Sequence, residues 1–132
     1  MSNEIDELRI LAAQQPELQM LQGALEYLSD PMIIVNTDYS IRYVNQQAEF
    51  VFGYSRKDLI GQHINILIPD SLKSVHLEHL SEFRNHPHAR AMKGGVELIA
   101  RRRDASDIKC RVQIAPIVTD YDRYVSAQIR VL

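Results

Sequence analysis

Two alternating segments joined by a polar turn, between Gly94 and Ile117, constrain the fold more than any other part of the sequence. Successive side chains of a strand point to opposite faces, so this alternation predicts two β-strands. Their apolar face holds Val96, Leu98, Ala100, Ile108, Cys110, Val112 and Ile114. The turn Asp104–Asp107 is rich in residues whose side chains bond nearby backbone groups. The stretch therefore predicts a β-hairpin with one apolar face, which a helix must cover.

A helix from about Asp70 to Arg84 is the nearest segment long enough to supply that cover. Pro69 suits the start of a helix, because its fixed φ matches the first turn. The apolar stripe of this helix holds Leu72, His76, Leu80 and Phe83. His76 is therefore expected to face inward, toward the hairpin.

The beginning of the chain, Glu4 to Leu28, also has the spacing of an amphipathic helix. Its apolar stripe holds Ile5, Leu8, Leu11, Leu18, Leu21 and Leu25. Pro16 is unfavourable inside a helix, so we expect a kink or two short helices near Gln15. The stripe either packs on the protein's own sheet or pairs with a second chain, and its size favours a homodimer.

The remaining segments are short. Met32–Val35 is apolar without alternation and predicts a central strand, and Ile41–Val44 predicts the strand that pairs with it. Asn45 is expected to cap a helix that ends at Gly53, and Ser55 a second helical turn.

Tyr124 to Leu132 is the last alternating strand. The order is thus two strands, several short helices, one longer helix and three strands. This order predicts an α+β fold with a five-stranded antiparallel sheet and short helices on one face.

The composition narrows the class of protein. A chain of 132 residues with 45% apolar residues fits one globular domain. A net charge of -2 gives no pull toward nucleic acid, and the run Arg101–Arg103 is interpreted as a solvated strand edge. One cysteine leaves no internal disulfide and suits a reducing compartment. Without a secretion signal or an apolar run long enough for a membrane span, we expect a cytoplasmic protein.

Several pieces of sequence occur together in a known order and spacing. They are DPMIIVNTDYSIRYVNQQAEFVFGYSRKDLIGQHINILIP, the Lys73–His76 helix with Phe83 and Pro87, Arg90–Met92, R-R-R-D and VQIAPI. From about Leu25 to Leu132 the chain thereby resembles the PAS sensor domain. The resemblance implies a signal-transduction module that binds a small ligand or cofactor between sheet and helices. It also implies an N-terminal helical segment, 1–28, at a dimer contact, a core domain, 29–132, and an effector domain or partner protein.

Three positions depart from the pattern of that family. The family often has Met-Gly at Met92-Lys93, Asp-Gly at Asp104-Ala105 and proline at Lys109. Alanine disfavours positive φ by roughly 1 kcal/mol, so we expect a different type of turn at Ala105.

His76 is the main candidate for a ligand-binding residue, because it matches the position of the axial haem ligand in the haem-binding PAS sensors. Those sensors also have a basic residue where this chain has Lys73. Neutral imidazole suits an axial ligand. The same histidine is also common in PAS domains without haem, and the positions near those that contact gas are Gly94 and Val96. A haem-based gas or redox sensor is therefore an alternative to a sensor of another ligand, with His76 the metal ligand only if haem binds.

Flavin is a less favoured cofactor. The light-oxygen-voltage subgroup has an asparagine-cysteine pair before Pro69, which this chain lacks, and Cys110 lies on a predicted strand. Cys110 is interpreted as a small buried hydrophobic residue.

A metal site formed by histidines is also not favoured. The pairs His76 with His79 and His86 with His88 lack further ligands for a metal site.

The predicted pocket is lined mostly by aliphatic and small residues. They are Ile34, Phe52, Leu59, Ile66, Leu72, His76, Leu80, Leu98, Ala100, Cys110, Ile114 and Ile129.

No phosphate-binding glycine loop, G-x-S-x-G or H-E-x-x-H motif is present, so no enzyme is expected. A purely structural interaction domain, with its pocket filled by Phe52, Phe83 and Met92, is the second alternative.

Overall fold

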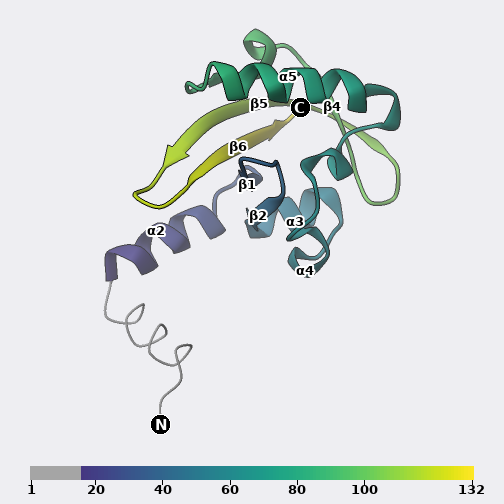
Figure 1. The fold of residues 1–132 in the computed structure, drawn as a ribbon. Coiled ribbons are helices and arrows are strands. Elements are labelled where there is room, and N and C mark those ends of the chain that lie inside the picture. Colours follow the sequence, from purple (N-terminus) through teal and green to yellow (C-terminus); the bar gives the residue numbers. More distant parts are fainter. Residues whose placement is uncertain (1–15) are drawn as a thin grey trace.

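The predicted hairpin forms part of an antiparallel sheet in the computed structural model, which describes residues 16–132 (Figure 1). Strand β4 (Leu98–Arg101) pairs with β5 (Asp107–Val118), and Leu98 lies opposite Cys110. Ala100, Ile108 and Cys110 are buried, as the alternation predicts. The hairpin therefore presents its apolar face to the core.

The other strands complete the sheet around this hairpin. They are β1 (Met32–Asn36), β2 (Ile41–Val44), β3 (Arg90–Ala91) and β6 (Arg123–Val131). The order is β2-β1-β6-β5-β3, with β4 also on β5, so the first strand pairs with the last. The described part has six strands rather than the expected five, because the two-residue β3 pairs with Ile114 and Gln113 of the long β5. The antiparallel α+β prediction is confirmed.

Helices and 3-10 turns connect the strands. They are α2 (Pro16–Glu26), α3 (Gln46–Phe52), α4 (Arg56–Leu59), η1 (Ile64–Leu67), η2 (Asp70–Leu72), α5 (Lys73–Asn85) and η3 (Met92–Gly95). The helix predicted over Asp70 to Arg84 thus begins as a 3-10 turn. The predicted caps are confirmed: the Asn45 side chain accepts from Ala48 N–H, Gly53 takes φ 78°, and the Ser55 side chain accepts from Asp58 N–H.

Helix α2 has no buried residue, and its first turns extend away from the main core (Figure 1). Pro16 is its first described residue, where proline is tolerated. Leu18 and Leu21 are 49% and 64% exposed, and Leu25 is half-buried. Leu18 and Leu21 therefore do not pack into the protein's own core. The predicted contacts of Ile5, Leu8 and Leu11 lie outside the described residues.

Asn45 joins the last turn of α2 and the segment after it to the core. Its side chain is fully buried, and its Oδ1 accepts from Met32 N–H at 2.9 Å and Ala48 N–H at 3.0 Å. Its Nδ2 donates to the carbonyls of Leu25 at 2.9 Å and Asp30 at 3.0 Å. One amide therefore satisfies the helix α3 cap and fixes the chain on its way from α2 into β1.

A second connection runs from α2 to α4. Glu26 forms a two-pronged ion pair with Nη2 of Arg56, at 2.6 and 2.7 Å, and accepts from the Tyr43 hydroxyl at 2.9 Å. The Arg56 guanidinium also lies over the Tyr43 ring, 5.6 Å from its centre. The pKa of Tyr43 is raised to about 12, chiefly because the hydroxyl is partly buried and secondly because it donates to Glu26. The end of α2 is thus held to the core although its earlier turns are exposed.

Two sequence interpretations of the hairpin are wrong. Ala105 takes a left-handed φ of 69° rather than another turn type, because Asp104 Oδ1 accepts from Ser106 N–H at 2.9 Å and Ala105 N–H donates to Arg102 O. The run Arg101–Arg103 is not simply solvated. It contacts the helical layer through Asp70, the Val51 carbonyl and Asp58 respectively.

Candidate functional site

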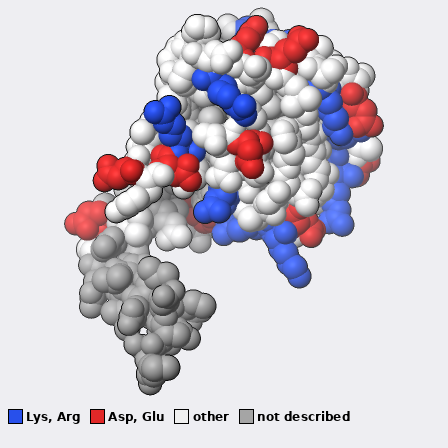
Figure 2. Space-filling model, viewed as in Figure 1, with Lys and Arg blue, Asp and Glu red and all other residues white. Residues whose placement is uncertain are grey.

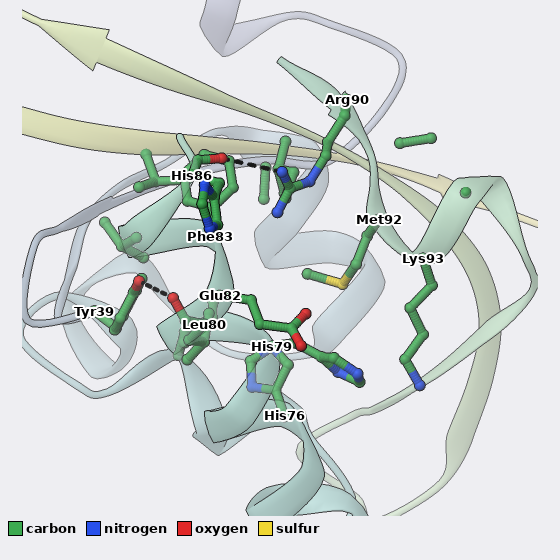
Figure 3. A pocket seen from close by; sticks show the side chains of 17 residues that line it. Tyr39, His76, His79, Leu80, Glu82, Phe83, His86, Arg90, Met92 and Lys93 are labelled. Carbon is green, nitrogen blue, oxygen red and sulfur yellow. Dashed lines mark hydrogen bonds between the residues drawn. The ribbon is translucent and has the colours of Figure 1, made fainter. Parts of the chain in front are cut away.

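A cavity of about 600 Å3 lies between helix α5 and the inner face of the sheet (Figure 3). Helix α5 contributes His76, His79, Leu80, Glu82 and Phe83 to its lining. The strands contribute an apolar wall of Val35, Ile114, Val125 and Ala127, and the segment through β3 and η3 contributes Arg90, Ala91, Met92, Lys93 and Gly94. The helix covers the sheet as predicted, but leaves room that side chains do not fill.

A smaller cavity of about 130 Å3 adjoins the first and is mostly apolar. The two share Ile64, His76, His79, Met92, Lys93 and Ala127 in their linings. The smaller one extends toward Phe52, Leu67 and Cys110 in the core. Together they form a mostly apolar space whose polar groups come from α5 and from the segment through β3 and η3, as is typical of small-molecule sites.

His76 stands between the two cavities and is half-buried. Its Nδ1 lies 2.5 Å from Oδ1 of Asn65, an oxygen that only accepts, so the Nδ1–H donates and Nε2 keeps its lone pair. Burial, with smaller effects of His79, His63 and Lys93, lowers the pKa of His76 to about 4. The imidazole is therefore neutral at neutral pH, in a defined tautomer.

Helix α5 is fixed over the cavity at its middle. The Tyr39 hydroxyl, from the turn between β1 and β2, donates to the Leu80 carbonyl at 2.5 Å. Tyr39 is buried, and its backbone adopts a left-handed φ of 66°. Leu80 and Phe83, which follow His76 on the predicted stripe, are both buried, whereas Leu72 is 39% exposed. The inward orientation of the stripe thus applies to its second half.

The structure brings most of the predicted pocket residues to the two cavities. The larger is lined by His76, Leu80 and Ile114, and the smaller by Phe52, Leu72, His76, Leu98, Ala100, Cys110 and Ile129. Ile34, Leu59 and Ile66 line neither: Leu59 is buried in the core, Ile66 packs against it, and Ile34 is half-buried on β1. Cys110 is buried and unpaired, and burial raises the pKa of its thiol.

The sequence interpretation did not identify Asn65, Arg90 or Lys93 at this site. Asn65 lies within an apolar irregular stretch, and its contact with His76 joins η1 to α5. Lys93 lies in η3 with a left-handed φ of 51°. The available signal was the lysine itself, which occupies a position where the resembled family often has glycine.

Metal-ligating groups, surface charge and helix length bear on other classes of site within the described residues 16–132. Among them, no group of three or more histidine, cysteine, aspartate or glutamate side chains is placed to hold a metal ion. Acidic and basic side chains are interspersed over the face shown in Figure 2, instead of forming one basic surface. None of the described helices has the length and apolarity needed to cross a membrane.

Comparison with known proteins identifies relatives in signalling. The chain is 29% identical over 107 residues to the oxygen sensor protein DosP of Escherichia coli, and 26% identical over 110 residues to the sensor protein FixL of Bradyrhizobium diazoefficiens. These matches cover 81% and 83% of this chain but only 13% and 22% of those proteins. The chain thus spans less than a quarter of each relative's length.

The fold is shared with solved PAS domains. The PAS domain of an HTR-like protein from Haloarcula marismortui matches with a TM-score of 0.70 and 19% identity, over 89% of this chain and 98% of that one. The family model described as the PAS fold matches residues 19–131. This chain therefore belongs to the PAS family of sensor domains.

Proposed function

We propose that this chain is the sensory module of a signal-transduction protein, and that it binds a small ligand or cofactor in the cavity beneath α5. The observation that carries the proposal is the roughly 600 Å3 space lined by apolar side chains with His76 among them. Two relatives named as sensor proteins support the same class of function. The module acts by a change of shape that the ligand stabilises, and no enzymatic step is proposed.

Haem is a second candidate, favoured by the state of His76. Asn65 holds the Nδ1–H, so that Nε2 of a neutral imidazole remains available, as an axial ligand requires. A bound haem would supply reversible gas binding or a redox change. His76 and Asn65 fit the axial side of a bound haem. Gly94, which lines the cavity, has no side chain with which to contact a gas molecule. Non-covalent flavin remains a less favoured cofactor.

The test for haem is a titration of the purified protein with haemin, followed by absorbance spectroscopy. A sharp Soret band that shifts on reduction and disappears in His76→Ala would support a haem sensor with His76 as metal ligand. His79→Ala is the matched control, because His79 lines the same cavities one turn further along α5. A band that survives in His76→Ala, or no specific band, would exclude this candidate.

The general proposal has its own test. Extraction and mass spectrometry of the purified protein should release a stoichiometric small molecule. A purely structural interaction domain would release none and would show no gain in melting temperature with any compound. The open cavity favours the sensor, because Phe83 and Met92 lie at its lining without filling it.

Signal output is proposed to pass through the N-terminal helical segment, 1–28, while 29–132 forms the sensory core. Leu18, Leu21 and Leu25 would contact a second copy of the chain together with Ile5, Leu8 and Leu11, because Leu18 and Leu21 are exposed. An effector domain or partner protein would read the resulting helix arrangement. Analytical ultracentrifugation should show a dimer that Leu21→Glu weakens and that the control Gln22→Glu, at a neighbouring exposed position, leaves intact.

A further inference from the structure

Lys93 occupies a position on the cavity wall that is unfavourable for lysine. Its backbone has φ 51° and ψ 37°, and Gly94 follows with φ 71°, so two consecutive residues are left-handed. Glycine adopts this conformation without penalty, whereas a residue with a side chain loses roughly 1 kcal/mol. Strain of this kind tends to persist at functional sites. Its side chain lines both cavities, and Figure 3 shows it extending from η3 beside the open space.

The charge of Lys93 is not matched by a protein carboxylate. Within residues 16–132 neither Lys93 nor Arg90 forms an ion pair, and Glu82 is the one carboxylate among the described residues that line the larger cavity. Arg90 is held in place, because its guanidinium lies 5.2 Å from the centre of the Phe83 ring and its Nη1 donates to the His86 carbonyl. Two cationic side chains, Lys93 and Arg90, thus share the lining of the larger cavity with one carboxylate, Glu82.

The neighbouring histidine is affected by the same charge. Lys93 and His76 line both cavities, and Lys93 contributes, after burial, His79 and His63, to lowering the pKa of His76. The smaller cavity is lined by Phe52, Leu67 and Cys110 and is mostly apolar. A ligand that satisfies both parts has an apolar body and an anionic end.

We propose that Lys93 determines ligand specificity, selecting a small amphipathic anion whose apolar body lies in the cavities and whose carboxylate or similar group pairs with the Lys93 ammonium. This inference rests on the proposed ligand-binding function and names the chemical class of the ligand. Lysine in place of glycine costs stability at this turn, and the anionic contact is what the lysine provides in return.

Two dyes of one ring system test the inference. 8-Anilinonaphthalene-1-sulfonate has an apolar body and one anionic group, and N-phenyl-1-naphthylamine is the same body without the sulfonate. Fluorescence titration of the wild-type protein gives a dissociation constant for each dye. Lys93→Met should lower the preference for the anionic dye by roughly five- to tenfold, the size expected for one partly solvated charge pair.

Matched variants separate the effect of the Lys93 charge from that of its backbone conformation, and binding in the cavity from binding at the surface. Lys93→Gly should lose the same preference while relieving the strained φ, and Lys93→Arg should keep it. Lys109→Met removes an exposed lysine from the hairpin, where it pairs with Glu97 at 3.6 Å, and should leave the preference unchanged. Ala127→Phe, on the wall shared by both cavities, should weaken both dyes, with circular dichroism checking that the variant is folded.

The outcomes distinguish this inference from the proposed function. If both dyes bind in the cavity and Lys93→Met has the wild-type preference, the anionic ligand class is refuted while the ligand-binding function survives. If neither dye binds, or if the folded Ala127→Phe variant binds both as tightly as wild type, both proposals are overturned.

Discussion

Replacing Asn45 by alanine should destabilise the protein more than the loss of an ordinary helix cap. The cap of α3 alone contributes about 1 kcal/mol. The substitution also leaves the Met32 N–H without its partner at a buried position, which costs a further ~1–3 kcal/mol. The carbonyls of Leu25 and Asp30 are only partly buried and can bond to water instead. We therefore expect a total loss of about 3 kcal/mol in the free energy of unfolding.

Urea denaturation followed by circular dichroism measures this loss as a shift of the midpoint at constant slope. Ser55→Ala is the matched control, because Ser55 caps α4 at an exposed position with one hydrogen bond of 3.3 Å and should cost only about 0.5–1 kcal/mol. A loss for Asn45→Ala no larger than that of the control would refute the argument that Asn45 holds the end of α2 and the segment after it.

Asn45→Asp refines the test through its pH dependence. The aspartate keeps the acceptor for Met32 and Ala48 but places a carboxylate against the carbonyls of Leu25 and Asp30. Burial and those carbonyls should raise the pKa of this carboxyl in the folded state above its unfolded value of about 3.9. Measured as the difference from wild type at each pH, the stability of this variant should be greatest below pH 4 and fall as the pH rises through the folded pKa. A variant as stable as wild type at pH 8 would contradict this account.

Three further measurements test other parts of the structure. Ala105→Gly should raise the free energy of unfolding by about 1 kcal/mol, since glycine relieves the φ of 69°; an unchanged urea midpoint would show that the turn is not strained. The pKa of His76 is about 4 in the folded state against 6.5 in the unfolded state, so its contribution to stability is present above pH 6.5 and is lost as the pH falls toward 4, by about 3 kcal/mol at most. The difference in unfolding free energy between pH 7 and pH 4 should therefore be smaller in His76→Phe. An equal difference in both proteins would show that the pKa of His76 is not lowered by folding. Glu26→Gln should lower the pKa of Tyr43, because the hydroxyl loses a charged partner; spectroscopic titration of tyrosine ionisation checks this, and an unmoved tyrosine would indicate that Glu26 does not contact it in solution.

Local features of the sequence predicted the elements that depend on local physics. The caps at Asn45, Gly53 and Ser55 follow from side-chain and backbone preferences within a few residues, and the structure has all three. The alternating hairpin was likewise predictable, because burial of one face sets a period of two along the first part of β5. Strand β3 was not, since a two-residue pairing depends on how far β5 extends rather than on its own sequence.

The candidate site was only partly predictable for the same reason. His76 could be placed on an inward stripe from helical spacing, but its tautomer depends on Asn65 in a different element. Leu59 and Ile66, which the sequence interpretation assigned to the pocket, line neither cavity; both are apolar and at least partly buried, but they pack within or against the core. Periodicity reports which face is buried, whereas a cavity is the volume that packing leaves over.

The pairing of β1 with β6 has a consequence for how the chain acquires its structure. Met32 lies opposite Gln128, so this ladder joins residues from nearly opposite ends of the described chain. Contacts so distant in sequence form slowly, because a large loop must close before they gain any stability. During synthesis Ile33 and Val35 therefore remain without their neighbour strand until β6 has left the ribosome. Late closure leaves one edge of the β1–β2 hairpin unpaired in the nascent protein, where it is exposed to aggregation.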